Sequence, residues 1–174
     1  MTDAASDRAV HVGVGVPDGS LAVLADRQAV LDVLHHYCYC VDHRLPNGIA
    51  DEVFSPDAVD DHGFDRWEGR EQLRAAFTSI VERFTATAHL LANPRILIDG
   101  DRATSHCHVT AWHWLPGGAS HEADFVMVGT YEDELRRLDE GWRITFRRFR
   151  RVGPTPTASG QLPDFLRRYR PDES

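Results

Sequence analysis

The sequence predicts an α+β domain in which helices pack on the concave side of a curled antiparallel sheet. Three observations predict this fold class. Up to residue 84, apolar side chains recur at helical spacing, whereas beyond it they alternate as in strands. Turn-forming residues separate the strands, so hairpins are the short connections between them. The strands are longer than average, so the sheet must curl and can leave a pocket under the helices.

Two helices are expected in the first half of the chain. The first spans residues 21–42, and Pro46-Asn47-Gly48 must end it. Its apolar stripe consists of Val30, Leu34, Tyr37 and Val41. A turn at Ser55-Pro56-Asp57 and a weak strand at 58–61 follow. Gly69 then opens the second helix, over residues 70–84, where apolar side chains again follow the helical period.

Four strands are expected after the second helix. They cover residues 88–98, 102–115, 122–135 and 142–152. The segments between them, including Asp99-Gly100-Asp101, are rich in Gly, Pro and Asp, which favour turns. Consecutive strands are therefore expected to form an antiparallel meander.

Length and composition fit one soluble domain. The chain has 174 residues, of which 42% are hydrophobic and 26% charged, close to the average of globular proteins. Residues 21–152 are expected to form this domain. Residues 1–20 are expected to be a poorly ordered lead-in, and residues 153–174 a Pro-rich tail with a short helix.

Charge and motifs exclude several classes of function. The net charge of −8 repels phosphate backbones, so a nucleic-acid partner is not expected. No apolar run approaches the length of a membrane helix, and the first residues lack the features of a signal peptide, so the cytoplasm is expected. The chain has no glycine-rich phosphate loop, GxSxG or CxxC motif, and no cofactor is predicted. The three cysteines are expected to be reduced thiols.

Two groups of polar residues are candidates for metal sites. His106 and His108 share one face of a predicted strand, but no third or fourth ligand is evident, so no metal is predicted. An acidic run surrounds His62 and lacks the spacing of a calcium loop, so a solvated edge is expected. The run consists of Asp57, Asp60, Asp61 and Asp65.

Tyr37, Asp42 and His89 form a sharper group. Asp42 follows the apolar stripe of the first helix, and His89 lies near the start of the first long strand. A histidine held by a carboxylate in a dry pocket is a general base with a defined tautomer. Spacing alone leaves a second interpretation open, in which Asp42 only ends the helix and His89 is a hydrogen-bonded core residue.

Five segments, in order, resemble the SnoaL-like branch of the NTF2-like superfamily. They are DRQAVLDVLHHYCYCVDHR, VFSPDAVDDHGFDRWEGREQL, HLLANPRILIDGDRAT, GTYEDEL and GWRITFRR. The resemblance covers about residues 22–152. It implies a cone, in which a strongly curved antiparallel sheet wraps around about three helices and encloses a pocket.

The resemblance also implies a site. Asp42 and His89 fall on an Asp-His pair shared by dehydratases and a dehydrochlorinase of the family. Tyr37 matches a tyrosine near the leaving group, and Arg147 matches a pocket arginine. His113 is placed like a second active-site histidine, and Asn93 and Tyr131 match pocket positions. The full set of substrate-binding residues predicted is Asn93, Val109, Ala111, His113, Tyr131 and Phe149.

These residues predict a cofactor-independent lyase or isomerase of the dehydratase type. His89 would take a proton from carbon, Asp42 would orient it, and Tyr37 would assist the leaving group. Arg147 would stabilise developing negative charge. The substrate would be an apolar ring compound such as a polyketide, steroid or terpenoid. Alternatives within the superfamily are a polyketide cyclase, a non-catalytic binding module and the structural β subunit of a ring-hydroxylating dioxygenase.

Self-association is also expected. A curled sheet has an outer face to cover, and on one predicted strand Trp112, Trp114, His106 and His108 alternate onto the same face. Family members similar in these motifs are dimers or trimers, so a homodimer or homotrimer is predicted.

Overall fold

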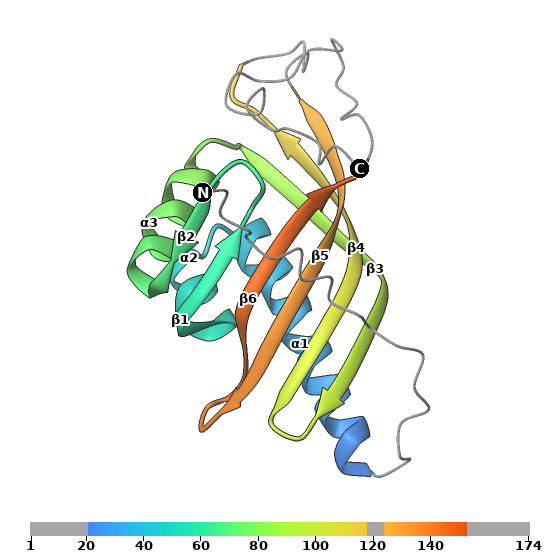
Figure 1. Ribbon diagram of the computed structural model, residues 1–174. Coiled ribbons are helices and arrows are strands. Elements are labelled where there is room, and N and C mark those ends of the chain that lie inside the picture. The colour runs from blue at the N-terminus through green and yellow to red at the C-terminus, as the bar shows by residue number, and fades with distance from the viewer. Residues whose placement is uncertain (1–20, 118–123, 153–174) are drawn as a thin grey trace, which may run out of the picture.

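The computed structural model describes residues 21–117 and 124–152, and the predicted lead-in and tail lie outside them. The α+β class is confirmed, with helices first and long strands afterwards (Figure 1). The helical elements are α1 (Leu21–Asp42), α2 (Pro46–Gly48), the π-helical turn η1 (Ile49–Val53) and α3 (Gly69–Glu82). The strands are β1 (Phe54–Asp61), β2 (Arg66–Glu68), β3 (Ala86–Asp99), β4 (Arg102–Trp114), β5 (Phe125–Leu138) and β6 (Gly141–Arg151).

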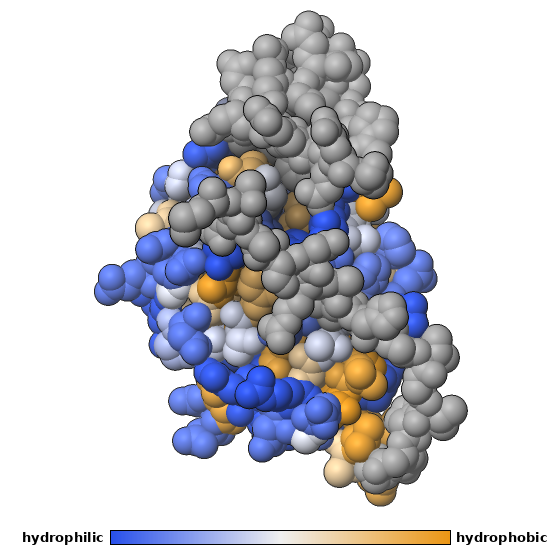
Figure 2. Space-filling view, in the orientation of Figure 1, coloured by the Kyte–Doolittle hydropathy of each residue, from blue (hydrophilic) through white to orange (hydrophobic). Residues whose placement is uncertain are grey.

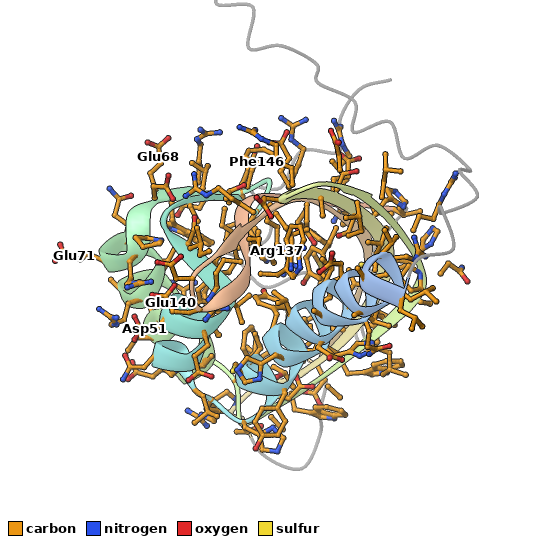
Figure 3. All side chains as sticks on the ribbon, turned by 90° about the horizontal axis from the view of Figure 1, so that it is seen from below. Asp51, Glu68, Glu71, Arg137, Glu140 and Phe146 are labelled. Atoms are coloured by element: carbon orange, nitrogen blue, oxygen red, sulfur yellow. The ribbon has the colours of Figure 1, made fainter. Side chains whose placement is uncertain are left out.

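The six strands form one sheet in the order β2-β1-β6-β5-β4-β3. The predicted meander is confirmed, because β3 to β6 pair antiparallel with their neighbours in sequence. β1 pairs in parallel with β6, a pairing that the sequence does not predict and that joins the first strand to the last. The sheet curves around α1, as the view from below shows (Figure 3).

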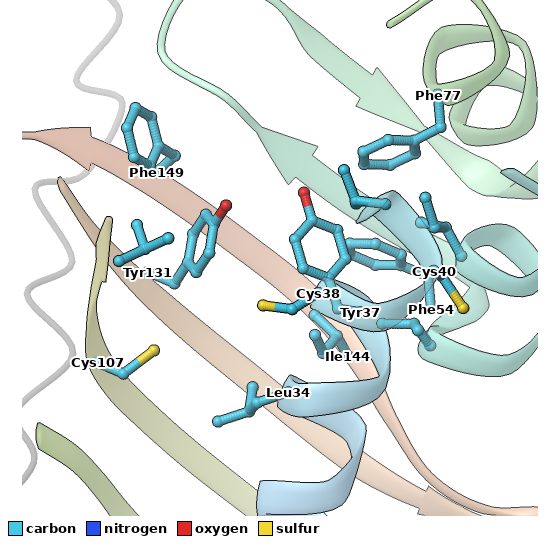
Figure 4. Close-up of a cluster of buried hydrophobic side chains, with 14 of the residues drawn as sticks. Leu34, Tyr37, Cys38, Cys40, Phe54, Phe77, Cys107, Tyr131, Ile144 and Phe149 are labelled. Carbon is cyan, nitrogen blue, oxygen red and sulfur yellow. The ribbon is translucent and has the colours of Figure 1, made fainter. Parts of the chain in front are cut away.

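The core lies between α1 and the concave face of the sheet. The predicted α1 stripe is buried, and α3 and η1 add further apolar side chains (Figure 4). Large side chains with almost no exposed surface include Leu34, Tyr37, Phe54, Phe77 and Ile144. This packing fixes the orientation of α1 over the strands and thereby places its last turn against β3.

Some apolar surface remains exposed. The exposed large apolar side chains of α1 and β3 are Leu21, Leu24, Tyr39, Leu90 and Leu97. Figure 2 shows hydrophobic surface over the start of α1 and the end of β3, whereas the surface near α3 is largely hydrophilic.

Candidate functional site

A cavity opens on the concave side of the sheet, between the end of α1, α3 and strands β3 to β6. Its space, including the mouth toward solvent, is about 890 Å³. A concave site with mainly apolar walls is typical of small-molecule binding. Its walls are mainly aromatic and aliphatic. Of the predicted site residues, those that line it are Tyr37, His89, Val109, Ala111, His113, Tyr131 and Phe149.

The last turn of α1 carries Asp42 toward the cavity. Arg44 takes the left-handed conformation with φ of 59°. The Leu45 N–H then donates to the Cys40 carbonyl at 2.8 Å, and the Arg44 N–H to the Val41 carbonyl at 3.1 Å. These two bonds are those of a Schellman motif, so they close the helix directly after Asp42.

Three hydrogen bonds from β3 hold the Asp42 carboxylate. Oδ1 lies 2.6 Å from Nδ1 of His89 and accepts a bond of 2.8 Å from the Thr87 hydroxyl. Oδ2 accepts a bond of 2.9 Å from the His89 backbone N–H. The carboxylate therefore contacts both the ring and the backbone of His89, whose side chain is only 6% exposed.

Opposing effects set the charge of Asp42. Partial burial raises the pKa of this carboxyl, but the bonds from His89 and Thr87 outweigh it and hold the pKa below its ordinary value. The C-terminus of a helix carries partial negative charge, so a carboxylate there needs such donors. With Nδ1 bonded to Asp42, Nε2 is the ring nitrogen left for the cavity.

His113 packs beside His89 in the cavity wall. Their ring centroids are 5.7 Å apart, and the His113 ring stacks on Phe125 at 4.5 Å. Burial, with the charge of His89 second, lowers the pKa of His113 to about 3. His113 is therefore a neutral imidazole at ordinary pH.

Tyr37 and Tyr131 lie next to each other at the wall and pack edge to face, with their ring centroids 5.7 Å apart (Figure 4). Burial raises the pKa of each phenol above its ordinary range, although Arg147 acts in the opposite direction. Both tyrosines therefore remain protonated and can donate a hydrogen bond.

Arg147 does not line the cavity, contrary to the prediction of direct contact with substrate. Its guanidinium lies between the rings of Tyr37 and Tyr131, 4.2 and 4.1 Å from their centroids. It is fully buried and pairs with the buried carboxylate of Asp133. Arg147 therefore lies one layer behind the wall and acts on it through the two tyrosines.

Asn93 also lies away from the cavity, contrary to the prediction that it faces the pocket. The pairing of β3 with β4 shifts register between Ala92 and Arg95, and Asn93 adopts φ of 54° in this bulge. A bulge inserts one extra residue and breaks the alternation of faces. Asn93 is consequently exposed, and Ile96 takes the next inward position.

His62 is a cavity residue that sequence analysis assigned to a solvated edge. The run around it is not uniformly solvated, because Asp60 is completely buried and its Oδ1 lies 3.2 Å from Nδ1 of His62. Period-two alternation would have indicated that His62 points to the cavity, since Ala58, Asp60 and His62 fall on one face of the strand. The density of acidic residues concealed this pattern.

Neither a metal cluster nor a membrane helix is found within residues 21–117 and 124–152. No three His, Cys, Asp or Glu side chains there gather around a point that could hold a metal ion. None of the described helices is long and apolar enough to cross a membrane. The three cysteines are free thiols, as predicted, and burial raises the pKa of Cys38 and Cys107 to about 12.

The fold matches that of NTF2-like proteins. A family model of the SnoaL-like domain matches residues 22–148, so the chain belongs to the SnoaL-like domain family. An uncharacterized protein of Mycobacterium tuberculosis, Rv2910c, is 28% identical over 127 residues, which cover 72% of this chain and 84% of that protein.

Two solved structures show the same fold. A candidate scytalone dehydratase from Novosphingobium aromaticivorans superposes with a TM-score of 0.70 at 22% identity, covering 78% of this chain and 89% of that one. A hexachlorocyclohexane dehydrochlorinase, LinA type 2, gives a TM-score of 0.70 at 19% identity, covering 82% and 95%. This fold is therefore shared with proteins that are named for elimination reactions.

Proposed function

We propose that the protein is a cofactor-independent lyase or isomerase that removes a proton from carbon in an apolar cyclic substrate, in the manner of a dehydratase. One observation carries this proposal. His89 lines an apolar cavity, and its Nδ1 lies 2.6 Å from the Asp42 carboxylate. A pocket that only bound a ligand would not need a histidine held in this way.

His89 acts as the base through Nε2. Asp42 holds the ring by Nδ1, fixes the tautomer and stabilises the imidazolium that forms. Thr87 holds Asp42 in turn, by the bond of 2.8 Å to Oδ1. The end of α1 adds a partial negative charge on the same side.

The remaining groups can stabilise the negative charge that develops on the substrate away from the base. Tyr37 donates a hydrogen bond to the leaving group or to an enolate oxygen. Arg147 positions Tyr37 and Tyr131 from behind, because its guanidinium packs on both rings. The apolar wall, including Val109 and Ala111, selects ring compounds such as polyketides, steroids or terpenoids.

Proton abstraction can be tested without the natural substrate. β-Tetralone is an apolar ring ketone with acidic C–H bonds, and NMR in deuterium oxide follows exchange of those hydrogens. The wild-type protein is expected to accelerate exchange, and His89→Ala to lose on the order of 10²–10⁴-fold of that rate. Asp42→Asn should also lose most of it.

A matched control is His108→Ala, which removes an exposed histidine from β4 and should leave the rate unchanged. Binding of β-tetralone without exchange that depends on His89 would overturn the proposal. That result would favour the non-catalytic binding module.

A further inference from the structure

A second carboxylate-histidine pair faces the same cavity. Nδ1 of His62 lies 3.2 Å from Oδ1 of Asp60, and His62 lines the cavity. The His62 side chain is 16% exposed and that of Asp60 is fully buried. The arrangement repeats that of His89 and Asp42, but it comes from the end of β1.

The surroundings of Asp60 leave one negative charge without compensation. Asp60 lies beside Arg147 in the register of β1 with β6. Arg147 is already engaged by both oxygens of Asp133, so two buried carboxylates share one buried guanidinium. Oδ2 of Asp60 is buried and has no hydrogen-bond partner among the described residues. An imidazolium at His62 would neutralise the remaining charge.

Aromatic rings hold His62 in place. Its ring stacks on Phe149, with centroids 5.4 Å apart and planes 24° apart. Phe64 and Phe77 meet it edge-on, at 5.5 and 6.5 Å. Packing on several sides limits the rotamers of His62, so its Nε2 keeps a defined position at the cavity wall.

The two histidines reach the cavity from opposite parts of the sheet. His89 lies on β3, at one edge, and His62 follows β1, beside the other edge. Among the described residues, neither ring contacts the other, although both line the same cavity. A ring substrate in this cavity would therefore lie between two nitrogens, each backed by a carboxylate.

We propose that His62 is the general acid of the reaction, opposite the base His89; this inference rests on the proposed function. Nε2 of His89 takes the proton from carbon, and the C–H electron pair forms the new double bond. The bond to the leaving oxygen breaks with its electron pair, and that oxygen takes the proton from Nε2 of His62. Asp60 holds the imidazolium until this transfer, and Tyr37 orients the leaving oxygen.

Two elimination probes separate the acid from the base. Unsubstituted benzisoxazole releases a basic phenolate, whereas nitrobenzisoxazole releases a stabilised one. In each, the base removes the C–H proton, the nitrile forms and the N–O bond breaks. Protonation of the leaving oxygen matters mainly for the basic phenolate. Absorbance of the released phenol follows both reactions.

Three variants test the assignment. His62→Phe keeps a ring against Phe149 but cannot donate a proton, and Asp60→Asn keeps a hydrogen-bond partner without the charge. Both should lower kcat on benzisoxazole by on the order of 10²-fold and on nitrobenzisoxazole by much less. His89→Ala should lower both rates equally. Circular dichroism and thermal unfolding check that each variant is folded.

The outcomes distinguish the two proposals. If His89→Ala lowers both rates while His62→Phe lowers neither, or lowers both equally, His62 is not the acid and the proposed function stands. If His89→Ala has no effect on either probe, the proposed function fails as well. A loss confined to KM in His62→Phe would indicate packing rather than proton donation.

Discussion

Arg147 donates from Nε and Nη2 to the two carboxylate oxygens of Asp133, at 2.7 and 2.9 Å, and neither side chain exposes any surface. This bidentate pair lies beneath the tyrosines of the cavity wall. The guanidinium can therefore influence the site without lining the cavity, because it packs on the two rings that form the wall.

Removal of one partner of this pair should be costly. Arg147→Met leaves the Asp133 carboxylate buried without a counterion, which should lower the free energy of unfolding by about 3–5 kcal/mol. The double variant Arg147→Met/Asp133→Asn should recover part of that loss, and urea denaturation measures both. Asp133→Asn completes the cycle, and if the losses of the two single variants add up to that of the double variant, the pair does not act as a unit.

Acid should destabilise the protein through His113. The unfolded state takes up a proton near the ordinary histidine pKa of 6.5, whereas folded His113 resists it down to a pKa of about 3. The unfolded state thus binds more protons between these two pKa values. His113 therefore lowers the free energy of unfolding by about 1.4 kcal/mol for each pH unit below 6.5. Urea denaturation at several pH values should show a shallower acid loss for His113→Gln. Equal slopes in the two proteins would refute the assignment.

Thr87 should act through Asp42. Thr87→Val removes the hydroxyl that donates to Oδ1, and a bond to a charged group is worth about 1.5–3 kcal/mol. We expect lower stability and slower exchange of β-tetralone, with a smaller rate loss than in Asp42→Asn. Thr87→Ser keeps the hydroxyl and is the matched control. If Thr87→Val behaves like the wild type and Thr87→Ser is the impaired variant, the contribution of Thr87 is its methyl group.

Gly129 controls the shape of the cavity wall. A Cβ at this position would lie 2.3 Å from Cε2 of Phe149 and 2.5 Å from the Arg150 carbonyl oxygen. Gly129→Ala should therefore displace the Phe149 ring, on which His62 stacks, and destabilise the fold by about 1–3 kcal/mol. Affinity for β-tetralone should fall with it. Phe149→Leu in the same chain should recover part of the loss by making room.

Self-association is a prediction that light scattering can test. We expect a homodimer or homotrimer that covers the outer face of β4, where Trp112 is only half-buried in the single chain. Trp112→Glu should shift the mass toward the monomer. A wild-type monomer at micromolar concentration would contradict the expectation.

The elements with strong periodicity could be predicted from sequence. The α1 stripe and the hairpin turns follow local rules, so α1, α3 and the four long strands were expected within a few residues. The parallel pairing of β1 with β6 could not be predicted from the sequence, because contacts between distant segments leave no local pattern. The bulge at Asn93 could not be predicted either. It inserts one extra residue, so each later side chain of the strand points to the opposite face from the one that alternation predicts.

The site residues also include some that could be predicted from the sequence and some that could not. Asp42 and His89 could be placed because a carboxylate at the end of an apolar stripe needs a donor, and the family resemblance supplied His89. The burial of Arg147 depends on Asp133, its neighbour on the adjacent strand, which no spacing in the sequence connects to it. His62 was missed because its acidic neighbours are hydrophilic on average, although only Asp60 among them is fully buried.

The pairing of β1 with β6 bears on the order in which the protein folds. The wall that carries His89 is built from α1 and the adjacent hairpin of β3 and β4, whereas β1 gains a long neighbour only when the last strand docks. Contacts between distant segments form late, because closing a long loop costs entropy before the contacts repay it. During refolding, the surroundings of His89 should therefore assemble before those of His62, so a nascent chain would acquire half of its cavity first.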